Sequence, residues 1–136
     1  MNFGILVSLL LFLIPMEVRM IERSTAVKLK KSQYDIVTVT MYSPSIEECD
    51  STPLITASGY KIDPINPRKQ KIIAISWDLK KKYKFGKKVK VLGIGKYSGT
   101  YTVRDLMNKR HKKRIDILVN VEDKQTKFER AKLYKI

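Results

Sequence analysis

The side chains best suited to acid–base or nucleophilic chemistry in this chain of 136 residues are three aspartates, the one histidine and the one cysteine: Asp78, Asp105, Asp116, His111 and Cys49. A carboxyl group can donate or accept a proton in catalysis when its surroundings adjust its pKa. The lone cysteine excludes an intrachain disulfide and a zinc site of several cysteines. No nucleophile motif surrounds it, and the histidine stands in a run of Lys and Arg typical of the surface. The carboxylates are therefore the candidates, and we expect no metal and no cofactor.

Asp116 lies in the middle of a β-branched run, Arg114–Val119, which predicts a strand. Alternation places Asp116 on the same face as Arg114 and Leu118, opposite the two isoleucines that flank it. An aspartate beside an apolar residue on a partly closed surface can have a raised pKa, as a general acid requires. The alternative is a solvated carboxylate paired with Arg114, which would have a structural role only.

The other two aspartates each have a structural explanation beside a chemical one. Asp105 follows a predicted strand and precedes a loop, a position where aspartate commonly caps a turn. Asp78 follows Ser76, the expected N-cap of a short helix, so its carboxylate would be stabilised by the helix dipole. Either residue can also face a site shared with Asp116.

Positive charge is the strongest signal in the composition. Lys and Arg number 28 against 13 Asp and Glu, which gives a formal net charge of +15. Such a surface attracts polyanions, among them nucleic acid, anionic membrane and a carboxylate-bearing cell-wall polymer. The densest basic run, Lys109–Arg114, can hold such a polymer or be a solvated loop. No helix-turn-helix, zinc-finger or aromatic–basic RNA-binding signature accompanies the charge, so we do not expect nucleic acid as the partner.

Short runs of β-branched and apolar residues, separated by turn-forming residues, predict a mainly β domain. The expected strands are 36–42, 54–57, 71–75, 89–92, 99–103 and 114–119, with a further short one at 133–134. Two short helices are expected at 77–83 and 122–131. Short strands with turns between them and few helices favour a small closed barrel.

The N-terminal segment Phe3–Met16 is almost wholly apolar. It is shorter than the roughly 20 residues that span a bilayer, and it fits the apolar core of a secretory signal. We therefore expect residues 1–20 to be a signal peptide or N-terminal anchor, 21–34 a linker and 35–136 the folded domain; a wrongly assigned start site is the third alternative. Export would place the domain in the periplasm or cell envelope, at a membrane only if the segment is uncleaved.

Five short motifs lie between residues 55 and 119: ITASG at 55–59, AISWDL at 74–79, FGKKV at 85–89, YTVRD at 101–105 and RIDI at 114–117. Together they resemble the triple-aspartate (3D) domain family. The step of 11 residues from Asp105 to Asp116, with Arg-Ile before the last aspartate, is the most specific part. In these motifs the chain is similar to the double-psi β-barrel catalytic domain of membrane-bound lytic transglycosylase A, and the likeness covers about residues 36–135.

The resemblance implies a six-stranded double-psi β-barrel that cleaves the MurNAc–GlcNAc glycan strands of peptidoglycan. Asp116 would be the catalytic acid, and Asp105 and Asp78 would line the same groove. A lytic transglycosylase needs only one carboxyl group, which protonates the bridging oxygen and then takes the proton of the sugar C6 hydroxyl to close a 1,6-anhydro ring. The resemblance thus implies a monomeric lyase, or a glycan hydrolase, that works without a cofactor.

The loop between the last two aspartates departs from the family pattern. Many members have a glycine-rich loop there, whereas residues 106–113 of this chain read LMNKRHKK. We expect Lys109, Arg110 and Arg114 to hold carboxylates of peptidoglycan, and Thr56 and Ser58 to hydrogen-bond the glycan. A non-catalytic peptidoglycan-binding barrel is the alternative, and a nucleic-acid-binding protein a more distant one.

Overall fold

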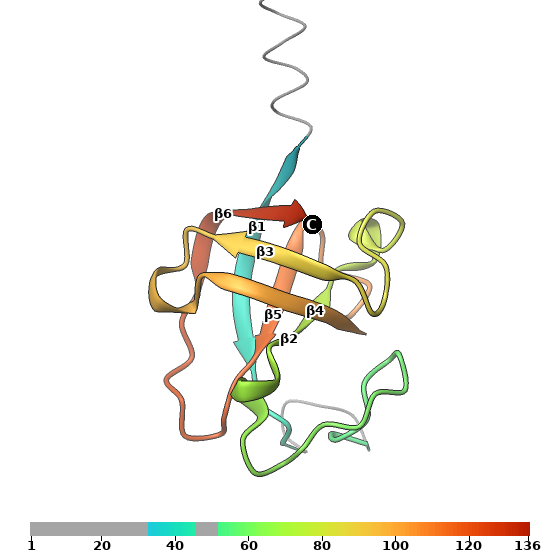
Figure 1. The fold of residues 1–136 in the computed structure, drawn as a ribbon, viewed down its shortest axis with the longest axis vertical. Helices are drawn as coiled ribbons and strands as arrows, with labels where there is room; N and C mark the ends of the chain where they lie inside the picture. Colours follow the sequence, from blue (N-terminus) through green and yellow to red (C-terminus); the bar gives the residue numbers. More distant parts are fainter. Residues whose placement is uncertain (1–32, 46–51) are drawn as a thin grey trace, which may run out of the picture. The chain divides into compact units, whose positions relative to one another are not determined.

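Six strands close into a barrel in the computed structural model, which describes residues 33–45 and 52–136 (Figure 1). The strands are β1 (Tyr34–Tyr42), β2 (Ile72–Ile75), β3 (Lys88–Leu92), β4 (Gly99–Leu106), β5 (Arg114–Leu118) and β6 (Phe128–Lys135). Three 3-10 turns lie between them: η1 (Pro67–Gln70), η2 (Trp77–Leu79) and η3 (Gly95–Tyr97). The expected mainly β, six-stranded barrel is confirmed.

The predictions for the N-terminal segment, for most of the linker and for Cys49 lie outside the described residues. The barrel begins at Tyr34, one position before the expected boundary. In the part of the chain that the structure describes, no helix has the length and apolar character needed to cross a bilayer.

The strands pair in two interlocked halves. Their order around the barrel is β1-β5-β2-β4-β3-β6, so β5 lies between β1 and β2, and β2 lies between β5 and β4. Exchanging β1 with β4, β2 with β5 and β3 with β6 maps every pair onto a pair of the same direction, including the two parallel pairs β1–β5 and β2–β4. This pseudo-twofold threading is the connectivity expected of a double-psi barrel.

Local backbone geometry repeats with the same symmetry. Lys71 and Lys113 immediately precede β2 and β5, and both have left-handed φ angles, 53° and 47°. Their carbonyls accept equivalent hydrogen bonds, from the amide of Thr102 to Lys71 at 2.8 Å and from the amide of Thr38 to Lys113 at 3.0 Å. Strands β2 and β5 therefore begin with the same left-handed bend of the backbone.

The barrel interior is filled by alternate side chains of the strands, as the period of two requires. Val37, Val39 and Met41 face inward from β1, and Ile115 and Ile117 face inward from β5. Asp116 consequently points to the outer face.

A second apolar cluster covers part of that outer face. Its buried members are Tyr42, Ile62, Ile72, Ala74 and Leu118, and Leu54, Tyr60 and Met107 pack against it. Residues 54–62, which precede β2, and the loop after β4 thus fold back over the sheet. They create the walls of a groove outside the barrel.

Two predicted helices are wrong. Residues 122–131 form a loop and the start of β6, where Arg130 has a left-handed φ of 57° and the register with β1 shifts between Val37 and Val39. This bulge changes the phase of the strand, so Phe128 and Ala131, three positions apart, both pack in the core. Apolar residues three positions apart are also typical of the buried face of a helix, which explains the wrong prediction.

The helix expected at 77–83 is only the 3-10 turn Trp77–Leu79. The chain turns early because Tyr83 must reach the core, where its hydroxyl lies 2.6 Å from Asp35 Oδ2 and 3.0 Å from the Leu133 carbonyl. The strand expected at 54–57 is reduced to one bridge, between Ile55 and Lys61.

Asp35 is expected to make the stability of the barrel depend on pH. Burial alone would raise its pKa, but hydrogen bonds from Lys82 and Tyr83 and the charge of Lys113 outweigh burial and lower the pKa. Stabilisation from a lowered pKa is present above the unfolded value of about 3.9 and is lost as the pH falls through the folded value. Asp35→Asn should therefore lower the thermal midpoint at pH 7, and the difference from wild type should vanish in strong acid.

Glu129 offers the matched control, because it also pairs with a lysine, Lys127 at 2.8 Å, but on the open surface. Glu129→Gln should leave the thermal midpoint unchanged at both pH values, since exposed pairs contribute little. Equal midpoints for wild type and Asp35→Asn at pH 7 would show that the hydrogen bonds of Asp35 do not stabilise the barrel.

Candidate functional site

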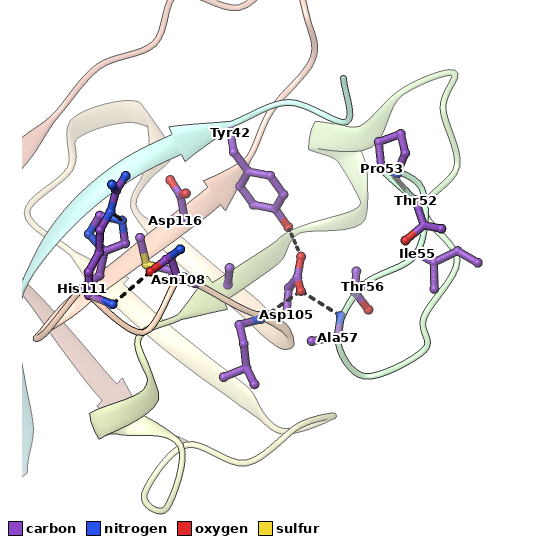
Figure 2. Close-up of a pocket in the computed structure, with 14 residues that line it drawn as sticks. Tyr42, Thr52, Pro53, Ile55, Thr56, Ala57, Asp105, Asn108, His111 and Asp116 are labelled. Atoms are coloured by element: carbon purple, nitrogen blue, oxygen red, sulfur yellow. Dashed lines mark hydrogen bonds between the residues drawn. The ribbon is translucent and has the colours of Figure 1, made fainter. Parts of the chain in front are cut away.

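An open groove of about 630 Å³ lies on the outer face, across the ends of β1, β2, β4 and the middle of β5 (Figure 2). Of the predicted site residues, Asp105, Asp116, Thr56 and Arg110 line it. Asp78, Ser58, Lys109 and Arg114 do not. The remaining lining residues are Tyr42, Thr52, Pro53, Ile55, Ala57, Ala74, Leu106, Met107, Asn108 and His111.

A row of paired residues from four neighbouring strands forms the floor of the groove. Thr40 of β1 pairs with Asp116 of β5, Asp116 with Ala74 of β2, and Ala74 with Asp105 of β4. Adjacent strands are about 4.8 Å apart, so the Cα atoms of the two aspartates, two strands apart, are separated by roughly 10 Å. The side chain between them in this row is the small methyl group of Ala74, and the Tyr42 ring packs in the same apolar cluster and reaches Asp105 with its hydroxyl group.

Asp116 is half-buried in this floor. Its Oδ1 atom is inaccessible to solvent, while the residue contributes to the groove surface. The neighbouring Ile115 and Ile117 point into the barrel core, which fixes the orientation of the strand and hence of the carboxyl group. A ligand in the groove therefore meets an aspartate that is only partly hydrated and held by a rigid strand.

Asp105 ties the groove walls together. Its Oδ1 atom accepts hydrogen bonds from the amides of Ala57, at 2.8 Å, and Leu106, at 2.9 Å, and its Oδ2 atom accepts one from the Tyr42 hydroxyl at 3.3 Å (Figure 2). These three donors match an ionised carboxylate, which only accepts. Asp105 lies within β4 and not after it, so it fastens the distant turn at Ala57 to the strand, and it also lines the groove.

Asp78 lies outside the groove lining and holds the loop beside it. Burial alone would raise its pKa, but hydrogen bonds from Ser76 and from the Lys113 amide, the latter 3.0 Å long, outweigh burial and lower the pKa. By accepting from this amide, Asp78 anchors Lys113, whose left-handed backbone closes the loop. The structure brings two of the three predicted aspartates together and gives the third an anchoring position.

The basic loop, residues 107–113, is fastened at both ends by the segment after β2. At its start, the Met107 amide bonds to the Ile75 carbonyl at 2.9 Å, and the Trp77 indole nitrogen donates to the Met107 carbonyl at 3.0 Å. At its end, Ser76 exchanges two hydrogen bonds with the backbone of Arg114, of 2.9 and 3.1 Å. The motif around Asp78 therefore positions the loop that forms one end of the groove.

Charged side chains of this loop have two different surroundings. The ammonium groups of Lys109 and Lys80 lie 4.8 and 5.0 Å from the centre of the exposed Trp77 ring. His111 lies between Arg110 and Arg114, with ring nitrogens 3.4 and 3.1 Å from the guanidinium groups. Burial, followed by the charges of Arg114 and Arg110, lowers the pKa of His111.

The hydroxyl groups predicted to bind glycan are engaged in a turn. Thr56 Oγ1 lies 3.0 Å from Ser58 Oγ and accepts a hydrogen bond from the Tyr60 amide at 3.1 Å. Thr56 is buried, although it contributes to the groove wall. Their contacts are those of a local turn.

Sequence reasoning did not single out Ala74 or Asn108 as site residues. Ala74 is paired with Asp116 on one side and with Asp105 on the other, and no local sequence pattern reveals this pairing. Asn108 lies in a loop whose path depends on its hydrogen bonds to the segment after β2. Within residues 33–45 and 52–136, no group of three His, Cys, Asp or Glu side chains is arranged to hold a metal ion.

No protein-family model matches the chain, and neither a curated protein nor a solved structure matches it. The likeness to triple-aspartate domains therefore depends on the motifs in the sequence, taken together with a six-stranded barrel and a groove that contains two of the three aspartates.

Proposed function

We propose that the groove binds a glycan strand of peptidoglycan and cleaves it, with Asp116 as acid and then base. The observation that carries this proposal is the register row in which Asp116 and Asp105 face one open groove across Ala74. Carboxylates in a groove are the groups that glycoside cleavage uses. The resemblance to triple-aspartate domains supplies the substrate class, and with it export to the cell envelope.

In the proposed reaction, the protonated Asp116 carboxyl group donates its proton to the glycosidic oxygen as the bond from C1 to that oxygen breaks. The resulting carboxylate then accepts the proton of the C6 hydroxyl of the same sugar, whose oxygen attacks C1. A 1,6-anhydro sugar and a free hydroxyl group on the leaving sugar result, and Asp116 regains its proton. Asp105 supports the site by fixing Ala57 and Tyr42 around the groove.

A gel containing purified peptidoglycan tests the proposal in its simplest form. The folded wild-type chain should clear the gel at its own position and release soluble fragments from sacculi in solution. A folded chain that binds sacculi without releasing fragments would reject the lyase and leave the peptidoglycan-binding barrel, which the basic loop favours. A chain that neither binds nor cleaves sacculi would contradict both proposals.

Retention on peptidoglycan should depend on the basic loop under either function. Replacing Lys109, Arg110, Lys112 and Lys113 together by Gln removes four positive charges from exposed positions. Exposed charges are screened beyond about 8–10 Å at physiological ionic strength. We therefore expect wild-type binding to sacculi to weaken as salt is raised, and the fourfold variant to bind weakly even at low salt.

The matched control is a fourfold change between η2 and the start of β3, Lys81, Lys84, Lys87 and Lys88 to Gln, which removes the same charge from exposed residues that do not line the groove. Sedimentation with sacculi measures both variants. Equal losses in the two variants would show that net charge, and not the loop, determines retention.

A further inference from the structure

Basic side chains form one end of the groove. Arg110 and His111 line it, and Arg114 of β5 stands beside the imidazole ring. Figure 2 shows His111 and Asn108 on one side of Asp116, and Asp105, Thr56 and Ile55 on the other. The groove thus has a basic end and a less polar end, with the two aspartates between them.

Hydrogen-bond donors outnumber acceptors at the basic end. A guanidinium group only donates, and a neutral imidazole accepts at one nitrogen and donates at the other. The contacts from Arg114 to Nδ1, at 3.1 Å, and from Arg110 to Nε2, at 3.4 Å, therefore cannot both be hydrogen bonds. If the shorter contact is the bond, the Nε2–H group and the Arg110 Nε–H group face each other.

Among the residues that the structure describes, no ion pair joins Arg110 or Arg114 to a carboxylate. After the hydrogen bond from Lys127, the charge of Arg114 contributes to lowering the pKa of Glu129 on β6. Arg110 and His111 thus present donors to a solvent-open groove, and Arg114, outside the lining, stands beside the imidazole ring. Guanidinium groups present paired N–H donors whose geometry matches a carboxylate. An anionic group of a ligand is the partner that would satisfy them together.

We propose that Arg110, His111 and Arg114 form a carboxylate subsite at the basic end of the groove, which binds the acidic substituent of the glycan and so sets the direction in which the strand lies across Asp116. This inference rests on the proposed function. The carboxylate has two sources in peptidoglycan, the lactyl group on the sugar and the carboxylates of the stem peptide. Their chemistry at the subsite is the same.

A bound carboxylate should change the protonation of His111. In the free protein, burial and the charges of Arg114 and Arg110 lower its pKa. A carboxylate between the guanidinium groups offsets their charge and accepts from a protonated ring, so it raises that pKa. By linkage, binding is strongest below the free-state pKa, weakens between the two pKa values and levels off above the bound-state one.

Other charged groups lie near His111. Asp105 and Asp116 face the same groove, and Lys112 and Lys113 follow His111 in the loop. Between pH 5 and 8, histidine is the side chain whose ordinary pKa lies in range. Measuring Asp116→Asn in parallel isolates any contribution of that aspartate.

The test uses the fact that the chain has one histidine. NMR signals of its imidazole ring report the His111 pKa directly, without and with three probes. N-acetylmuramic acid carries the lactyl carboxylate, N-acetylmuramoyl dipeptide carries carboxylates only on the peptide, and N-acetylglucosamine carries none. We expect an upward shift with one or both of the acidic probes, an affinity at least about fivefold higher at the acid end of the range, and no shift with N-acetylglucosamine.

Arg110→Gln and Arg114→Gln should each weaken binding of the acidic probe about tenfold or more, since each loses a hydrogen bond to a charged group. Lys112→Gln, a loop residue outside the groove lining, should bind as wild type does. If Arg114→Gln fails to fold, the exposed Arg110 decides the matter alone.

Identical responses to acidic and neutral sugars, or unchanged binding in Arg110→Gln, would overturn the subsite. This outcome is distinct from failure of the proposed function. Cleavage of sacculi without a His111 response removes only the subsite, and a carboxylate-dependent response without cleavage removes only the lyase.

Discussion

Asp116→Asn is expected to lower the release of soluble fragments from sacculi by about 10²–10⁴-fold, the usual loss when a general acid is removed. The loss should lie at the upper end of this range, because the same group also serves as base. Asparagine is nearly the same size and cannot transfer the proton. Initial rates of fragment release, with thermal melts alongside, measure the effect at equal foldedness.

Asp105→Asn should lose less activity. The amide oxygen can still accept from the amides of Ala57 and Leu106, while the amide nitrogen faces the Tyr42 hydroxyl, which can accept instead of donating. Asp63→Asn, an exposed substitution outside the groove, is the matched control and should leave the rate unchanged. Residual activity in Asp116→Asn equal to that of wild type would reject Asp116 as the acid.

Ala74→Leu is expected to abolish cleavage while the barrel persists. The side chain of Ala74 occupies the floor between Asp116 and Asp105, so three added carbon atoms fill the space through which a sugar must pass. Displacing a substrate by about 1 Å can lower a rate about 10²-fold, and a blocked groove should exceed that. Overpacking costs about 1–3 kcal/mol in a closed core, and a loss in this range is expected because Ala74 is buried in the second apolar cluster.

Ala74→Gly separates steric blockage from any other effect at this position. It keeps the groove open and should retain most activity, although glycine inside a strand lowers stability by roughly 0.5–1 kcal/mol. Rates of fragment release and urea unfolding compare the three proteins. A fully active Ala74→Leu would show that the glycan does not cross the floor between the two aspartates.

The strands of the barrel could be predicted because most of them alternate strictly. Val37, Val39 and Met41 in β1 and Ile115 and Ile117 in β5 point inward as the pattern indicates. The last strand was hidden by the bulge at Arg130, where the phase change places Phe128 and Ala131 at a helical spacing. A bulge is determined by pairing with distant strands, so local sequence does not reveal it.

The candidate site could be predicted only in part. The 11-residue step that joins Asp105 to Asp116 identifies the two aspartates that the groove unites, whereas Asp78 has an equally clear motif and lies outside the lining. The role of Ala74 follows from the register of three strands that are far apart in sequence. Register depends on tertiary pairing, and a small apolar residue carries no chemical signal of its own.

The central claim is that Asp116, in the groove, breaks the glycan strand by an internal transfer of the C6 hydroxyl oxygen. Mass spectrometry of the fragments that the wild-type chain releases from purified sacculi tests it most directly. The account predicts fragments that end in 1,6-anhydro sugar, lighter by one water than those with a reducing end, and none above background with Asp116→Asn. Fragments with reducing ends would contradict the internal transfer and indicate hydrolysis, and the absence of fragments from a folded wild-type chain would contradict cleavage itself.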